Sequence, residues 1–168
     1  ASVLLVRETT AIATRATSPR KKAGISRVLL ATDGSKHSEA VTQFLISLPL
    51  PKRCEVIVII ALQSHLATLV RTPTLGFETN QELLVRLQAA EESEARKITT
   101  KAEEQLRAKG YRTASVVIRG GAAESILDAA NEYNPDIIAL GSRGLTGIES
   151  LLLGSVAERV ARYADCSV

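Results

Sequence analysis

The sequence predicts an α/β protein whose parallel sheet is covered by helices on both faces. Short apolar runs rich in branched residues alternate with amphipathic stretches at helical spacing from about Ser26 to the end of the chain. Each stretch is long enough for the crossover that joins parallel strands. At 168 residues, the chain has the size of one domain with a substantial core.

The strands are predicted from four apolar runs. RVLLATD (27–33) and CEVIVIIAL (54–62) are nearly continuous in apolar character, which is typical of strands buried on both faces. SVVIR (115–119) and DIIAL (136–140) are the third and fourth. Ligands of such sheets bind beyond the carboxyl ends of the strands, where Asp33-Gly34-Ser35 and a glycine-rich stretch after Leu140 lie.

Helices are predicted over 38–48, 81–109, 123–133 and 155–164. The apolar stripe of the long second helix consists of Leu83, Leu84, Leu87, Ile98 and Leu106. Gly110 stands where a C-cap glycine belongs. The loop over 63–80 is long for a compact domain, which is typical of a functional segment.

Composition and charge exclude several classes of protein. The longest apolar run, VIVIIAL, is far shorter than the roughly 20 residues of a membrane-spanning helix. Residues 1–27 carry a net charge of +5 and the whole chain +3, so residues 28–168 carry −2, which counts against a nucleic-acid-binding face on the domain. Cys54 and Cys166 lack CxxC spacing and the two histidines lack metal-ligand spacing, which favours a cytoplasmic protein without a metal site.

The two ends of the sequence indicate a tandem origin. Residues 1–7 are interpreted as the last strand of a preceding similar domain, 8–26 as a linker, and 27–168 as a domain that lacks its own C-terminal strand. A transit peptide is the alternative for the Arg- and Thr-rich tail. Val3–Val6 is expected to fill the free sheet edge, in its own chain or in a partner's, and strand exchange would then form a homodimer.

The stretch GSRGLTGIESLLLGS (141–155) exposes backbone between a strand and a helix. Phosphate binding needs such backbone N–H groups, preferably at a helix N-terminus. The stretch matches neither GxxxxGK[ST] nor GxGxxG. Two alternatives remain: a merely tight turn, and a capping box in which Ser155 and Glu158 satisfy helix N–H groups. For the glycine pair of GGAAES (120–125), a tight turn before a helix is the favoured interpretation.

The spacing G-x2-G-x9-G-S, formed by Gly141, Gly144, Gly154 and Ser155, resembles the nucleotide-binding motif of the universal stress protein family. VLLATDGSKHSEA, PDIIALGSRGLTG and LLLGSVAERVARYADCSV resemble other stretches of that family in the same order, over residues 26–168. The resemblance implies a Rossmann-like, adenine-nucleotide α-hydrolase-like fold: a doubly wound, five-stranded parallel sheet in the order 3-2-1-4-5. The N-terminal segment is a candidate for the fifth position.

The resemblance also implies ATP across strands 1 and 4, with Mg or Mn carried by the phosphates. Asp33 would contact the nucleoside, or else only close an Asx turn. Ala61 would offer backbone groups to the adenine, and Arg143 would pair with a phosphate or remain solvated. The full set of predicted contacts is Ala31, Thr32, Asp33, Ala61, Leu140, Gly141, Arg143, Gly144, Gly154, Ser155 and Val156.

The predicted function is an ATP-binding, nucleotide-dependent stress-response or regulatory module. Asp33 is the one candidate for a water-activating base, so at most slow ATP hydrolysis is expected, and no catalytic residue or metal ligand is assigned. One alternative is a dimerisation or interaction module without nucleotide. Another is an enzyme that adenylates a substrate, which would need a further binding region such as the loop over 63–80.

Overall fold

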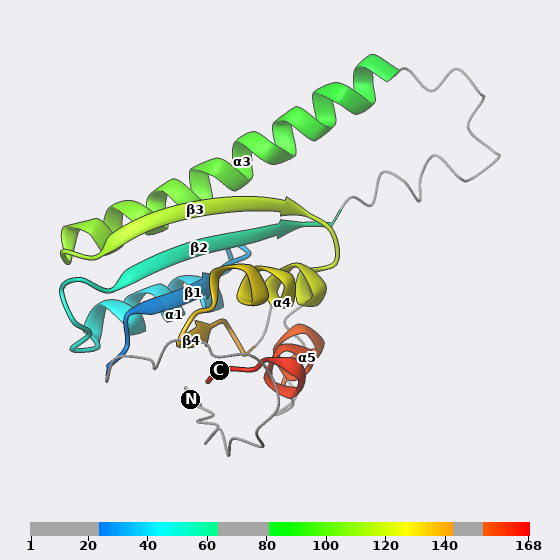
Figure 1. Cartoon of the computed structure of the whole chain (residues 1–168). Helices are drawn as coiled ribbons and strands as arrows, with labels where there is room; N and C mark the ends of the chain where they lie inside the picture. The colour runs from blue at the N-terminus through cyan, green and yellow to red at the C-terminus, as the bar shows by residue number, and fades with distance from the viewer. Residues whose placement is uncertain (1–23, 64–80, 143–152) are drawn as a thin grey trace.

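The computed structural model describes residues 24–63, 81–142 and 153–168 (Figure 1). Strands and helices alternate there as the sequence predicts. The elements in chain order are β1 (Arg27–Ala31), α1 (Lys36–Ser47), β2 (Glu55–Leu62), α3 (Gln81–Ala108), β3 (Arg112–Arg119), α4 (Ala122–Tyr133), β4 (Ile137–Ala139) and α5 (Ser155–Tyr163). The strands begin close to where the sequence predicts. The largest difference is at β3, which begins three residues before the predicted run SVVIR.

The strands form one parallel sheet in the order β3-β2-β1-β4. The prediction of five strands is wrong for the described residues, which form four. The chain after α5 does run beside β4, but Ser167 makes only a single parallel bridge with Ile137, and its carbonyl accepts one bond from the Ile138 N–H at 2.9 Å. One bridge is too short a ladder to count as a strand. The predicted occupant of this edge, Val3–Val6, lies outside the described residues.

The core lies on both faces of the sheet, because successive side chains of a strand point to opposite faces. Val28, Leu30, Val56 and Val58 pack against α1 and α3 on one face. The alternate residues of β1 and β2, together with Ile138, pack against α4 and α5 on the other. Figure 1 shows the two helical layers with the sheet between them.

Helix α3 is longer than the strand it accompanies. Its 28 residues extend about 42 Å, whereas the eight residues of β3 extend about 26 Å. Its N-terminal part therefore projects beyond the sheet (Figure 1). Leu106 is fully buried, but Leu87 of the predicted apolar stripe is 41% exposed. No helix within the described ranges is both long and apolar enough to span a membrane.

The C-terminal end of α3 is closed by Gly110, as predicted. Its φ of +97° lies in the left-handed region, which glycine adopts without steric cost. The Gly110 N–H donates to the Arg107 carbonyl at 2.8 Å, and the Tyr111 N–H donates to that of Leu106 at 3.2 Å. The chain thereby reverses directly into β3.

The amino end of the sheet is held by Asp136, which precedes β4. Its Oδ2 accepts hydrogen bonds from the Ser26 N–H at 2.7 Å, the Ser26 hydroxyl at 2.9 Å and the Arg27 N–H at 2.9 Å. Arg27 in turn pairs with Glu55 at 2.8 Å and donates to the Tyr133 carbonyl. The starts of β1, β2 and β4 and the end of α4 are thus fastened together by the chain's own side chains.

Candidate functional site

The carboxyl end of β1 continues directly into a compact turn. The Thr32 N–H still donates to the Ile59 carbonyl of β2 at 2.9 Å, so the chain leaves the sheet only at Asp33. The Ser35 N–H then donates to Asp33 Oδ1 at 3.0 Å, which is the Asx turn considered for this residue. Ser35 caps α1, since its hydroxyl accepts from the Ser38 N–H at 3.2 Å.

The Asp33 carboxylate is held in its ionised form. Burial raises the pKa of its carboxyl group, but hydrogen bonds from Ser35 and Ser38 lower it more, and the pKa lies below the ordinary value of 3.8. The Asx turn uses one bond to Oδ1. A carboxylate has about four acceptor positions, so a ligand hydroxyl would compete with Ser35 and Ser38 for the oxygens of Asp33.

Ser38 is a residue of this site that sequence reasoning did not select. It is only 3% exposed, its hydroxyl donates to the Ser35 carbonyl at 2.9 Å, and the Thr32 hydroxyl donates to it at 3.0 Å. Ser38 also helps to lower the pKa of Asp33. The available signal was its place three residues after the N-cap serine, where the first helical turn returns toward the cap.

The backbone conformation at Gly34 favours glycine, and α3 approaches this position closely. Its φ of +75° is left-handed, and a Cβ there would lie 2.7 Å from Ile98 Cδ1 of α3. Helix α3 therefore packs directly against the turn that carries Asp33. A cavity of about 260 Å³ adjoins this contact and is lined by Thr32 and by residues of α1 and α3. It lies below the usual size of a small-molecule site and does not mark the predicted pocket by itself.

The second part of the site lies where β4 ends and α5 begins. Leu30 of β1 is in register with Ala139 of β4, so the segments that follow these two strands leave the sheet side by side. The Gly154 N–H donates to the Ser142 carbonyl at 2.8 Å, which joins the two ends of the glycine-rich stretch. Leu140 and Val156 pack against the same core cluster, as expected for neighbours at this end of the sheet.

The capping box considered for Ser155 is not formed. Gly154 is the N-cap of α5 and Ser155 is the first helical residue, so the cap supplies no side-chain hydrogen bond. Glu158 pairs instead with Arg162 at 3.3 Å. Within the part of the chain that the structure describes, no side chain caps the first N–H groups of α5, and these groups carry the positive end of the helix dipole.

Helix α5 is fixed in this position by packing and charge. Val160 and Ala164 are buried against the sheet. Arg159 pairs with Glu124, in the first turn of α4, at 2.7 Å. The other glycine pair, Gly120-Gly121, leads directly into α4, in agreement with its interpretation as a turn before a helix.

The structure brings most of the predicted contacts to the carboxyl end of the sheet. Ala31 ends β1 and is followed by Thr32 and Asp33, and Ala61 is the penultimate residue of β2. The other described contacts flank the end of β4 and the start of α5: Leu140, Gly141, Gly154, Ser155 and Val156. Arg143 and Gly144 lie outside the described residues. Within the described ranges, no group of three or more His, Cys, Asp and Glu side chains could hold a metal ion.

Comparison of the sequence with known proteins finds the family that the glycine motif resembles. The model of the universal stress protein family matches residues 24–168. Universal stress protein MJ0531 of Methanocaldococcus jannaschii is 32% identical over 142 residues, which cover 84% of this chain and 79% of the relative.

Solved structures give the same fold. The structure of the hypothetical protein MJ0577 aligns with a TM-score of 0.72 at 24% identity, over 86% of this chain and 93% of that chain. A universal stress protein solved in complex with cAMP aligns with a TM-score of 0.58 at 20% identity, over 86% and 94% of the two chains. At these identities the likeness concerns the fold alone.

Proposed function

The chain belongs to the universal stress protein family, and from this premise we propose that it is a stress-response or regulatory module that binds ATP at the carboxyl end of its sheet. The observation that carries the proposal is one juxtaposition. The ionised carboxylate of Asp33 and the uncapped N-terminus of α5 lie at the ends of the adjacent strands β1 and β4.

The chemistry of these two groups suits the two ends of a nucleotide. A carboxylate accepts hydrogen bonds from the hydroxyls of a ribose, whereas the N–H groups and dipole of a helix N-terminus attract phosphates. Gly154 has φ −64° and ψ 149°, a conformation open to any residue. The glycine is therefore not required by the backbone, which supports a role in close approach of a ligand.

The remaining contacts are proposed from their positions. The backbone of Ala61 would face the adenine, and Gly141, Gly144, Ser155 and Val156 would surround the ribose and the phosphates. Arg143 would pair with a phosphate. Mg²⁺ or Mn²⁺ would be carried by the phosphates themselves.

Rapid hydrolysis of ATP is not part of the proposal. Asp33 is the candidate base, and its lowered pKa makes it a poor proton acceptor. The chemistry is therefore expected to be slow at most, and occupancy of the site would be the signal. The relative solved with cAMP raises the question of which adenine nucleotide this chain prefers.

The assembly and location of the module are also proposals. We propose a tandem arrangement with residues 1–7 and 8–26 as the preceding strand and the linker, a homodimer through exchange of Val3–Val6, and a cytoplasmic location. The single bridge at Ser167 supports the idea that the edge of β4 can take a further strand. Cys54 is a buried free thiol, which suits a reducing compartment.

The first test is to identify any nucleotide that the protein carries. The purified protein is denatured, and the released small molecules are separated by chromatography against ATP, ADP and cAMP standards. Release of ATP in near-stoichiometric amount would support the proposal, and release of cAMP alone would change the ligand. Absence of nucleotide, together with no binding of added ATP, would favour an interaction module with an empty site.

A further inference from the structure

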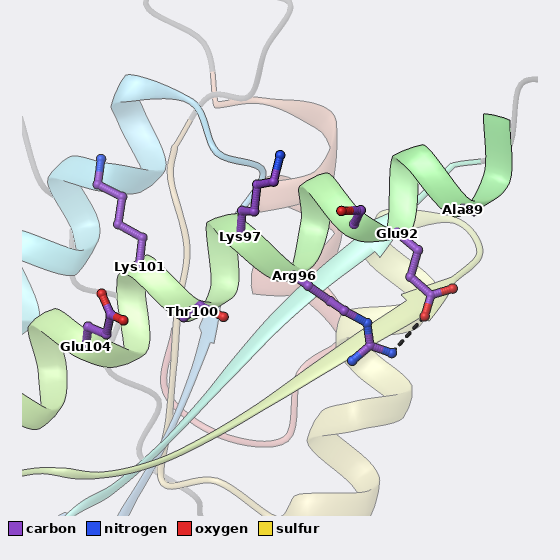
Figure 2. A pocket seen from close by; sticks show the side chains of 8 residues that line it. Ala89, Glu92, Arg96, Lys97, Thr100, Lys101 and Glu104 are labelled. Atoms are coloured by element: carbon purple, nitrogen blue, oxygen red, sulfur yellow. Dashed lines mark hydrogen bonds and ion pairs between the residues drawn. The ribbon is translucent and has the colours of Figure 1, made fainter. Parts of the chain in front are cut away.

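The outer face of α3 is open to solvent. A shallow depression runs along the helix between its side chains, and every residue that lines it belongs to α3. Ala89, Ser93 and Thr100 supply small side chains along it. Figure 2 shows Lys97 and Lys101 directed to one side of the helix, and Glu92 and Arg96, paired at 2.7 Å, directed to the other.

The projecting part of α3 adds an apolar residue to this face. Val85 is 63% exposed, lies one turn from Ala89, and precedes the level at which the sheet ends. That level is marked by Arg119, the last residue of β3, which donates to the Gln88 carbonyl at 3.1 Å. The face therefore runs from the covered part of α3 into the part that projects.

The charges on this face are arranged symmetrically about Ala89. Glu82 and Arg96 stand seven residues before and after it, which is about two turns in each direction, so the three residues lie nearly in one line along the helix. The side chains of Glu82 and Arg96 are each 69% exposed. Each also makes an ion pair within α3, Glu82 with Arg86 at 2.6 Å and Arg96 with Glu92 at 2.7 Å, and these two pairs flank Ala89 symmetrically.

We infer that this face binds the same face of a second copy of the chain, with the two α3 helices antiparallel and related by a two-fold axis at Ala89. A two-fold rotation about that point places Glu82 opposite the second copy's Arg96, and Arg96 opposite the second copy's Glu82. A parallel pairing would place like charges together instead. Antiparallel pairing is thus the arrangement that the charge pattern permits.

The shape of the face fits the same occupant. Two alanines meeting at the axis let the helices approach closely, and Val85 would be removed from water near the hollow at Ser93. The overlap spans about four helical turns, which is small beside the interfaces of permanent dimers. The contact is therefore a reversible one. It lies on the β3 side of the sheet, away from the edge of β4 that is proposed for strand exchange.

Cysteine cross-linking tests the axis directly. In the full chain, A89C brings two thiols together at the two-fold axis, whereas A90C, also exposed and one position further around the helix, directs them away. Under mild oxidation A89C should become mostly covalent dimer, while A90C and the unmodified chain, with its buried Cys54 and partly buried Cys166, should stay at background. Equal cross-linking of A89C and A90C would overturn the proposal.

Charge exchange tests the pairing. E82R and R96E each place like charges opposite one another, and the double variant E82R/R96E restores the opposite charges with reversed sign. Sedimentation equilibrium should show association weakened about tenfold in each single variant and returned to within about threefold in the double variant. Circular dichroism checks that α3 keeps its helicity. If both single variants associate as strongly as the unmodified protein, the dimer forms through another surface and the proposal is contradicted.

Discussion

The two ends of the parallel sheet differ in how their polar groups are hydrogen-bonded. At the amino end, Asp136 accepts three bonds from Ser26 and Arg27, and Arg27 is paired with Glu55, so the chain satisfies its own groups. At the carboxyl end, the N-cap of α5 is a glycine without a side-chain hydrogen bond, and Asp33 is an ionised carboxylate with a lowered pKa. The difference is that the amino end is fastened by the chain's own side chains, whereas the carboxyl end is the place proposed for a ligand.

The largest effect is expected for Gly154→Val, which tests the ligand end. The valine side chain would occupy the space through which a phosphate approaches the N–H groups of α5. ATP affinity should fall at least about 100-fold, or ~2.7 kcal/mol. Because φ at Gly154 is −64°, stability should change by no more than about 1 kcal/mol.

The matched control for this variant is Gly110→Ala. Its φ of +97° makes alanine costly, so the free energy of unfolding should fall by about 1 kcal/mol while ATP affinity stays unchanged. Titration calorimetry and urea denaturation measure the two quantities. Equal ATP affinity in Gly154→Val and the unmodified protein would contradict the proposal that ATP binds at the carboxyl end of the sheet.

The next largest effect is expected at the amino end, for Asp136→Ala. The substitution removes the acceptor of three hydrogen bonds at the starts of β1 and β4. The free energy of unfolding should fall by about 2 kcal/mol, with ATP affinity unchanged. Asp136→Asn keeps one acceptor oxygen and should lose less. A loss of ATP affinity in a folded Asp136→Ala protein would show that the two ends are not separate.

Asp33→Asn is expected to act mainly on binding. It removes the negative charge from the acceptor while preserving the shape of the side chain. Affinity for ATP should fall about tenfold, or ~1.4 kcal/mol, as for loss of a charge-assisted hydrogen bond. Calorimetry with ATP and with 2′-deoxy-ATP tests whether Asp33 contacts the ribose. If it does, removal of the 2′-hydroxyl should lower the affinity less in Asp33→Asn than in the unmodified protein. Unchanged affinity would leave Asp33 as an Asx turn only.

The Ser155→Ala substitution should have a smaller effect, and it distinguishes the two interpretations of this serine. Since Ser155 is the first helical residue and not the N-cap, its removal should leave stability within about 0.5 kcal/mol. ATP affinity should fall about threefold through loss of one hydroxyl contact. A loss of about 1 kcal/mol in stability with unchanged affinity would instead indicate a capping role.

The pH dependence of stability gives the smallest signal. The pKa of Asp33 is lower in the folded protein than its ordinary value of 3.8, so the unfolded chain binds the proton more readily. The stabilising contribution is complete above that value and is lost as pH falls through the folded pKa. The stability difference between the unmodified protein and Asp33→Asn should therefore diminish below pH 3.8. A difference that grows at low pH would contradict the direction of the shift.

Much of the fold could be predicted from local patterns. The apolar runs at β1 and β2 predict strands buried on both faces, and both are almost fully buried. Gly110 predicts its own left-handed conformation. The extent of burial along α3 could not be predicted in this way, because periodicity shows which side of a helix is apolar and not where the sheet beneath it ends. Leu87 belongs to the predicted apolar stripe and is nevertheless exposed.

The site was predicted less completely than the fold. Asp33 and the glycine stretch stand at strand ends, which the order of elements predicts. Gly154 and Ser155 are both good N-cap residues, so the sequence alone leaves the first residue of α5 open between them. Ser38 escaped selection because its hydrogen bond with Thr32 depends on how the start of α1 lies against the end of β1, whereas the sequence shows only a polar residue in a first turn.

Titration of the nucleotide-free protein with ATP by calorimetry tests the central claim most directly. The account predicts saturable binding of one ATP per chain, absent or at least about 100-fold weaker in Gly154→Val and unaltered in Asp136→Ala. No binding to the folded, emptied protein, or binding of equal strength in Gly154→Val, would contradict the proposal that the carboxyl end of the sheet holds a nucleotide.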